Sequence, residues 1–195
     1  MDAARQYDAL IAAYQRFGPL TADAEDALRA AHTPRFVEKG SLWLRAGTVC
    51  DCVGFIVEGA LHMFYETAER RTSVQFVFEN GITADYGSFL RQSPARLNIE
   101  ALESTFVLEM GYNAMQQLYA TVPSAERIGR KVAEFLFMAV SERNDSFILD
   151  DPELRYRKLV ETRPKVMQRV PLYMIASYLG ITPEALSRIR RRITK

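Results

Sequence analysis

The amino-acid sequence predicts an α+β fold, in which a β-sheet module lies between two helical regions. Short runs rich in β-branched and aromatic residues, separated by turn residues, fill residues 36–110. Apolar residues recur at helical spacing before and after that stretch. Residues 170–193 contain two short amphipathic segments on either side of Gly180, which is the pattern of two helices joined by a tight turn. The predicted order is therefore helices, sheet, helices.

Two helices are expected before the sheet module. Apolar spacing predicts the first over residues 2–17 and the second after Thr21, which is a suitable N-cap. The Thr33-Pro34 pair is expected to end the second helix, because a residue before proline avoids the helical conformation. The strands that follow are short and regularly interrupted, which favours a sandwich or barrel over an α/β sheet.

A long helix is expected to begin at Val122-Pro123 and to reach about residue 144. Along it, apolar residues spaced by 4, 3 and 4 positions form a heptad pattern and predict a homodimer interface, made by Ile128, Val132, Phe135 and Ala139. Residues 136–138 add a second apolar side, so the helix can pack inward and pair outward. A further helix is expected from Asp151-Pro152, with Leu154, Leu159 and Val160 facing inward.

Residues 170–193 predict a helix-turn-helix. The first helix carries an apolar stripe and stops at Gly180, where the chain can turn without the steric penalty of a Cβ atom. Thr182 is a good N-cap for the second helix, and Pro183 suits its first helical position. Glu184 then places a carboxylate in the positive first turn.

The second of these helices has two different faces. Leu186, Ile189 and Ile193 fall on one side, which is expected to pack inward. Polar side chains gather on the opposite side: Glu184, Ser187, Arg188, Arg191 and Lys195. Arg190 and Arg192 lie on the flanks, where a helix in the major groove passes the phosphates. The alternative to a DNA-reading face is a solvated charged face.

Charge is distributed unevenly along the 195 residues. Residues 151–195 contain 11 Lys and Arg against 4 Asp and Glu, a net charge of +7. Residues 1–150 contain 14 against 20, a net charge of −6. A basic C-terminal part beside an acidic remainder is typical of a chain that meets nucleic acid with one end.

Residues 179–189, and above all their Glu-x-x-Ser-Arg pattern, resemble the DNA-reading element of the Crp/Fnr superfamily of bacterial transcription regulators. Glu184, Ser187 and Arg188 match the family positions that contact base edges, and Arg191 matches a further basic position. The resemblance implies a homodimer that reads a two-fold symmetric double-stranded DNA site with a TGA core, with RNA polymerase as a partner. A second set of residues resembles the double-stranded β-helix of cyclic-nucleotide-binding domains: Gly40, Gly47, Phe55, Ile56, Val57, Gly59 and Leu61.

Three regions follow from this reasoning. Residues 1–120 are expected to hold the N-terminal helices and a jelly-roll-like β-roll sensor, and residues 121–147 the dimerisation helix. Residues 148–195 are expected to form a winged-helix-like helix-turn-helix domain. Its predicted DNA-binding residues are Thr182, Glu184, Ser187, Arg188, Arg190, Arg191 and Arg192. Because this chain stops at Lys195, a wing would have to come from elsewhere, for example from a two-stranded turn within residues 162–170.

The predicted effector pocket departs from the cyclic-nucleotide pattern of the resembled family. That family carries Phe-Gly-Glu and an Arg followed by a small hydroxyl residue, whereas this chain has Tyr86-Gly87-Ser88 and Ala95-Arg96. The carboxylate that would hold the ribose is missing, and the arginine is shifted by one position, which in a strand turns its side chain to the other face. Neither cAMP nor cGMP is therefore expected to be the effector. Gly87, Ser88, Arg96 and Asn98 remain candidates for a pocket that binds another small molecule.

No enzyme activity, metal or cofactor is expected from the sequence. Two histidines, His32 and His62, are too few for the cluster that a cupin-like metal enzyme needs. Cys50 and Cys52 are placed badly for a mutual disulfide and are interpreted as two small buried side chains. A cytoplasmic protein is expected, because no apolar run is long enough to span a bilayer. The alternative function is a small-ligand or cupin-like metal protein whose basic tail contacts another partner.

Overall fold

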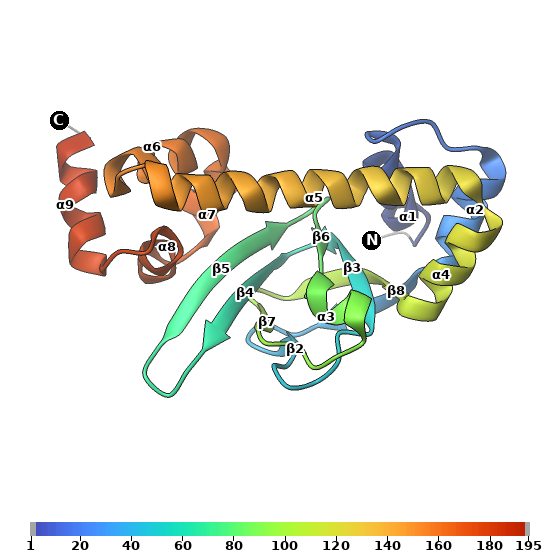
Figure 1. The fold of residues 1–195 in the computed structure, drawn as a ribbon, viewed down its shortest axis with the longest axis horizontal. Helices are drawn as coiled ribbons and strands as arrows, with labels where there is room; N and C mark the ends of the chain where they lie inside the picture. The colour runs from blue at the N-terminus through green and yellow to red at the C-terminus, as the bar shows by residue number, and fades with distance from the viewer. Residues whose placement is uncertain (1–2, 194–195) are drawn as a thin grey trace.

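Two antiparallel four-stranded sheets form an eight-stranded β-roll at the centre of the molecule (Figure 1). The structure is a computed structural model and describes residues 3–193. The first sheet has the order β1-β8-β3-β6, with β1 Thr33–Val37, β8 Thr105–Gly111, β3 Cys52–Glu58 and β6 Ile82–Thr83. The second has the order β2-β7-β4-β5, with β2 Leu42–Leu44, β7 Asn98–Ala101, β4 Ala60–Glu66 and β5 Arg71–Phe78. The α+β class and the sandwich-like module are confirmed, although the short strands β6 and β7 were not expected.

Helices cover one end of this roll. Helix α1 (Ala3–Gln15) and helix α2 (Ala22–Ala31) agree with the predicted pair, and the Thr21 hydroxyl caps α2 by accepting from the Ala24 N–H at 3.3 Å. Two further helices, α3 (Tyr86–Arg91) and α4 (Tyr112–Thr121), were not predicted. Helix α4 follows β8 directly and its N-cap is a glycine with no side-chain cap, so the sequence offers no start signal.

Helix α5 (Pro123–Leu149) runs along the length of the molecule in Figure 1. Proline stands at its first turn, as expected, because that position needs no N–H donor. Its first part is buried through Ala125, Ile128 and Val132, and most of the second half is exposed. The helix is therefore anchored at one end in the β-roll core.

Four short helices follow and are called here the C-terminal helical unit: α6 (Pro152–Thr162), α7 (Pro164–Arg169), α8 (Leu172–Leu179) and α9 (Pro183–Ile193). In α6 the inward residues are Tyr156 and Leu159, whereas Leu154 and Val160 are 42% and 41% exposed. The prediction that Leu154 and Val160 face inward was wrong. The buried face of α6 is made by Tyr156 and Leu159, which are three positions apart, and the other two residues lie outside it.

The predicted wing is not present in the part of the chain that the structure describes. Residues 164–169 form a helix instead of the two-stranded turn that was considered there. All strands lie between residues 33 and 111, so residues 112–193 carry no strand. The helix-turn-helix is confirmed as a pair of helices, and the winged-helix detail is not.

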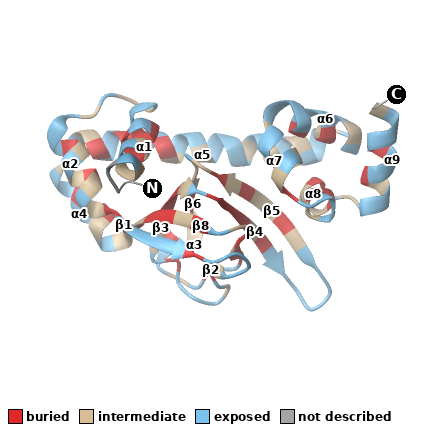
Figure 2. Cartoon of the chain, turned by 180° about the vertical axis from the view of Figure 1, so that it is seen from behind, coloured by how far each residue is buried: buried red, intermediate tan, exposed pale blue. Residues whose placement is uncertain are grey.

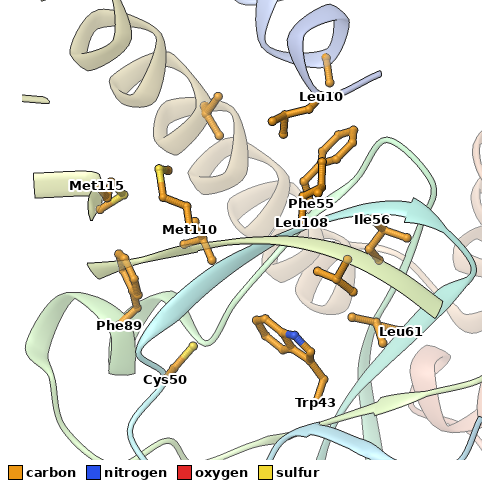
Figure 3. Close-up of a cluster of buried hydrophobic side chains, with 14 of the residues drawn as sticks. Leu10, Trp43, Cys50, Phe55, Ile56, Leu61, Phe89, Leu108, Met110 and Met115 are labelled. Carbon is orange, nitrogen blue, oxygen red and sulfur yellow. The ribbon is translucent and has the colours of Figure 1, made fainter. Parts of the chain in front are cut away.

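The buried apolar side chains form two clusters. Figure 2 colours the buried residues red along the chain. The larger one fills the β-roll and reaches α1, α2, α4 and the start of α5; Figure 3 shows part of it around Phe55, Leu108 and Met110. The smaller one joins Ala60, Phe76 and Phe78 of strands β4 and β5 to buried residues of α6–α9. The C-terminal helical unit therefore shares its core with the β-roll.

Candidate nucleic-acid interface

The turn between α8 and α9 depends on Gly180. Its φ of +70° lies in the left-handed region, and the Gly180 N–H is bonded to the carbonyls of Ala176 and Ser177. A Cβ atom at this position would also meet the Phe147 ring, with Cε1 at 2.9 Å. Glycine is therefore required here both by the backbone conformation and by the close approach of α5.

Thr182 begins α9 as predicted. Its hydroxyl accepts from the Ala185 N–H at 3.2 Å, and its carbonyl accepts from the Leu186 N–H at 3.0 Å. The pKa of Glu184 lies below its usual range, because its carboxylate accepts a hydrogen bond from the Glu184 backbone N–H and another from the Thr182 side chain. The positive charge of Arg188 lowers it further. The N-terminus of α9 thus favours negative charge, as helix N-termini do.

Helix α9 presents one buried and one exposed face. Leu186 and Ile189 are 1% and 5% exposed and belong to the smaller core cluster. The predicted DNA-binding residues are all exposed: Thr182, Glu184, Ser187, Arg188, Arg190, Arg191 and Arg192. Lys195, which was assigned to the same face, lies outside the described residues 3–193. The helix lies at the end of the molecule, beyond the tip of α5, in both Figure 1 and Figure 2.

Strand β5 holds the C-terminal helical unit in place. The Arg163 guanidinium donates to the Gln75 side chain and to the Phe76 carbonyl, each at 2.5 Å. The Ser177 hydroxyl of α8 accepts from the Ser73 N–H at 2.9 Å, at the free edge of the sheet. These contacts could not be predicted from the sequence, because their partners lie about 90 or more positions apart and no local pattern marks them.

The sequence and the fold of this chain are both similar to those of known proteins. Residues 34–122 match the family model of the cyclic nucleotide-binding domain. None of the curated proteins matches the sequence. Among solved structures, the c-di-GMP responsive global regulator CLP of Xanthomonas campestris is 16% identical, with a TM-score of 0.70 over 89% of this chain and 92% of that one. FixK2 of Bradyrhizobium japonicum is 17% identical, with a TM-score of 0.70 over 84% of both chains.

A third solved structure comes from Eubacterium rectale and is described as a transcriptional regulator of the crp/fnr family. It is 14% identical, with a TM-score of 0.68 over 92% of this chain and 88% of that one. This chain has the Crp/Fnr fold. The resemblance recognised in the sequence is thereby confirmed at the level of the fold.

Within this Crp/Fnr fold two of the four residues predicted to form an effector pocket meet at one carboxylate, because the Ser88 and Arg96 N–H groups donate to Asp85 at 3.1 and 3.3 Å. The Ser88 hydroxyl accepts from the Cys50 N–H at 3.0 Å and donates to the Ser93 carbonyl, and the Asn98 Oδ1 accepts from the Ala46 N–H at 2.8 Å. The Arg96 side chain is exposed, and a Cβ on Gly87 would meet the Arg91 guanidinium. Neither of the two cavities described for this chain is lined by Gly87, Ser88, Arg96 or Asn98. The Ser88 and Asn98 side chains thus stabilise loops, and the binding of a small molecule by these four residues stays a prediction.

Two of the four predicted dimer residues of α5 are buried in the protomer itself. Ile128 and Val132 are 2% and 8% exposed and lie in the larger core cluster. Phe135 packs against Phe17 with ring centroids 5.6 Å apart, and it lines a cavity together with Val132 and Ala139. Ile128 and Val132 are therefore part of the protomer's own core, whereas Phe135 is 58% exposed and Ala139 is exposed, so the place of these two in a dimer stays a prediction.

The two histidines are core residues. The His32 Nδ1 lies 2.7 Å from the Leu28 carbonyl, and the His62 Nε2 lies 2.9 Å from the Ser73 hydroxyl. Burial lowers the pKa of each to about 4. Burial also raises the pKa of the Cys50 thiol to about 11. Among the described residues no cluster of three His, Cys, Asp or Glu side chains is arranged to hold a metal ion.

None of the helices in residues 3–193 combines the length and apolar character needed to cross a membrane.

Proposed function

We propose that this protein is a homodimeric, sequence-specific regulator of transcription that binds double-stranded DNA through α9. The observation that carries the proposal is the exposed polar row of α9 at the end of the molecule, opposite its buried residues Leu186 and Ile189. A helix-turn-helix places its second helix in the major groove, with its N-terminal residues nearest the bases. The Crp/Fnr fold of the whole chain supports the same role.

The side chains of α9 divide into two groups. Glu184, Ser187 and Arg188 occupy the N-terminal, groove-facing side, where Arg188 would be bidentate to a guanine and Glu184 would accept from a cytosine amino group. Arg191 continues the same side, and Thr182 stands at the N-terminus, near the backbone. Arg190 and Arg192 lie on the flanks and would contact phosphates. Specificity is thus assigned to the first group and salt-dependent affinity to the second.

The dimer is proposed to form along a different face of α5 from the one predicted. Phe137, Val140 and Ile148 are 70%, 68% and 71% exposed. At about 100° per residue these three lie within about 80° of one another, with Asn144 between them. Phe137 and Ile148 lie on the side of α5 away from Ile128, and Val140 lies at the edge of this exposed apolar stripe, where it also lines the same cavity as Phe135. Pairing of two such stripes would give the two-fold symmetry that a palindromic site requires.

The proposed regulator does not respond to cAMP or cGMP, acts in the cytoplasm and works with RNA polymerase. The first statement is supported by the missing ribose-binding carboxylate and by Ser88, which is already bonded to the chain. The other two come from the family resemblance alone. No catalytic role is proposed.

Selection from a pool of random DNA duplexes tests the proposal. The full chain is expected to enrich a two-fold repeat whose half-site contains a TGA core. A variant with Glu184→Ala, Ser187→Ala and Arg188→Ala removes the groove-facing groups without touching the buried face, and should enrich no sequence. Enrichment of a non-repeated site, or of the same site by this variant, would contradict the placement of α9 in the groove.

A further inference from the structure

The turn between β5 and β6 contains an asparagine followed by a glycine, Asn80 and Gly81. The Gly81 N–H donates to the Phe78 carbonyl at 2.9 Å, which closes the turn. Asn80 has a φ of +66° and is one of two non-glycine residues in 3–193 with a positive φ. A Cβ on Gly81 would meet the Val77 Cγ1 at 2.5 Å and the Phe78 carbonyl at 2.8 Å. The turn therefore favours this pair, because asparagine tolerates the left-handed conformation and glycine fits the space after it.

An asparagine that precedes a glycine is prone to react with its own backbone. The glycine nitrogen attacks the side-chain amide carbon of the asparagine, and no Cβ on the glycine hinders the approach. The new C–N bond closes a succinimide ring, and the side-chain nitrogen takes up the proton lost from the backbone nitrogen and leaves as ammonia. Water then opens the ring at either carbonyl, which gives aspartate or isoaspartate. The sum is asparagine and water giving ammonia and a carboxylic acid.

Asn80 is accessible to this reaction. It is exposed to solvent, and its side-chain amide has no hydrogen-bond partner among residues 3–193, so the amide can rotate towards Gly81. The Gly81 nitrogen attacks when its hydrogen bond to Phe78 is open, which occurs by local opening of the turn. The reaction is therefore expected to be slower than in a short peptide and to proceed in the folded chain.

The other asparagines of the chain lie inside helices and strands. Asn98 is a buried residue of β7, Asn113 lies in α4, and Asn144 lies in α5. Regular secondary structure fixes the backbone at these residues, and none of them is followed by a glycine. They are therefore internal references of lower reactivity in the same molecule.

The residue before Asn80 joins β5 to the C-terminal helical unit. The Glu79 carboxylate accepts from Lys165 at 2.7 Å and from Arg169 at 2.7 and 2.9 Å. Both partners belong to α7, so the position of Glu79 affects how α7 is held against the β-roll. A change of the main chain at Asn80 therefore acts on this ion pair.

Isoaspartate changes the main chain at this place. The Asn80 N–H donates to the Ile56 carbonyl at 2.8 Å, and the Gly81 carbonyl accepts from the Ile56 N–H at 2.9 Å. Isoaspartate adds one methylene group to the main chain between these two hydrogen bonds, so the two cannot both keep their present geometry. Aspartate carries the same new charge and leaves the main chain unchanged.

We propose that Asn80 is a modification site at which spontaneous deamidation forms isoaspartate, and that isoaspartate in this turn weakens the link between Glu79 and the C-terminal helical unit. The modification needs only water, so the modified fraction grows with the age of the molecule. The turn is a different part of the chain from α9, and the modification is tested without DNA.

Incubation of the purified full chain at mildly alkaline pH tests the site, with peptide mass spectrometry as the measurement. Asn80 is expected to show the mass change of an amide converted to a carboxylic acid, severalfold faster than Asn98, Asn113 or Asn144. An L-isoaspartyl methyltransferase with S-adenosylmethionine should label the same peptide, because that enzyme distinguishes isoaspartate from ordinary aspartate. Conversion of Asn80 no faster than that of the other three, or a converted peptide without label, overturns the site.

Urea unfolding of aged and fresh samples tests the consequence. The aged wild-type chain should unfold at a lower urea concentration than the fresh chain. Asn80→Gly keeps the positive φ and removes the amide, so its aged and fresh samples should unfold alike. Asn80→Asp adds the charge without the methylene group and should unfold close to the fresh wild-type chain. In Glu79→Gln, which lacks the ion pair, ageing should cost less stability than in the wild-type chain.

Each comparison decides for or against the weakened link. It is overturned if ageing leaves the wild-type chain as stable as before, or if aged Asn80→Gly loses as much stability as the aged wild-type chain. A loss in fresh Asn80→Asp as large as that in the aged wild-type chain would assign the effect to charge and overturn the role of the main chain. An equal loss on ageing in Glu79→Gln and in the wild-type chain would overturn the role of the ion pair. A failure of DNA selection would leave these results unchanged.

Discussion

Arg169 of α7 holds the carboxylate of Glu79 in two parallel hydrogen bonds, with Nη1 to Oε2 at 2.9 Å and Nη2 to Oε1 at 2.7 Å. Lys165 donates to the same carboxylate at 2.7 Å, and Arg169 also pairs with Glu103. Bidentate arginine pairs are the strongest ion pairs available to a protein. This group therefore joins the C-terminal helical unit to the β-roll.

The Glu79 ion pair predicts a pH-dependent difference between the wild-type chain and Glu79→Gln. The Arg169 and Lys165 partners lower the pKa of Glu79 from 4.5 to about 2. The pair therefore stabilises the fold fully above about pH 5, and this stability is lost as the pH falls from about 4.5 towards 2. Because the pair lies at the surface, we expect a difference in unfolding free energy of about 1–2 kcal/mol at pH 7.

Urea unfolding at several pH values measures this difference. His32 and His62 titrate alike in both proteins, so their contribution cancels. Glu69→Gln, at an exposed turn, is the control and should change nothing. If the wild-type chain still has the larger unfolding free energy at pH 2, by the same amount as at pH 7, the ionised Glu79 carboxylate is not the cause of the difference.

Gly180→Ala is expected to destabilise the chain by two separate effects. A positive φ of 70° costs a residue with a Cβ atom about 1–2 kcal/mol, and the close Phe147 ring adds steric strain. Gly40→Ala is a matched control, because its φ is +80° and no atom lies within 4 Å of the added Cβ. Thermal unfolding should show the larger loss for Gly180→Ala. Equal losses would mean that Phe147 moves aside at no cost.

Arg188→Ala and Arg190→Ala are expected to impair DNA binding in different ways. Loss of a bidentate contact to guanine should cost about 1–3 kcal/mol per half-site and relax the preference at that base. Arg190→Ala should weaken binding to all sequences about equally and reduce the salt slope by about one unit per lost phosphate contact in each half-site. Arg192→Ala should resemble Arg190→Ala. Titrations with matched and mismatched duplexes at several salt concentrations separate the two patterns, and unchanged base preference in Arg188→Ala would refute its assignment.

Val140→Asp with Ile148→Asp should give a monomer, because the two charges fall on the exposed apolar stripe of α5 and would be buried without partners in a dimer. Both side chains are exposed in the protomer, so the fold itself should be unaffected. Sedimentation equilibrium at micromolar concentration measures the change. Glu134→Gln, on the same helix, is the control. A monomeric wild-type chain would remove the basis for the dimer.

The sequence was most informative where structure depends on local chemistry. Thr182, Gly180 and Pro183 act at the positions where their backbone preferences had placed them, because caps and turns are set by a few neighbouring residues. The burial of Ile128 and Val132 in the protomer could not be predicted, because packing against distant parts of the chain decides which side of α5 is covered. The backbone partners of Ser88 and Asn98, at Cys50 and Ala46, could not be predicted because they lie on distant loops.

The shared core of strands β4 and β5 with α6–α9 has a consequence during synthesis. Phe76 of the sheet leaves the ribosome about 100 residues before Tyr178 of α8, whose ring packs against it with centroids 5.5 Å apart. At about 5–20 residues per second, this delay lasts on the order of 5–20 s. During that time the apolar side chains at the β5 edge of the nascent β-roll are exposed to solvent. The hairpin of β4 and β5 is therefore the segment that we expect a chaperone to bind, or another chain to aggregate with.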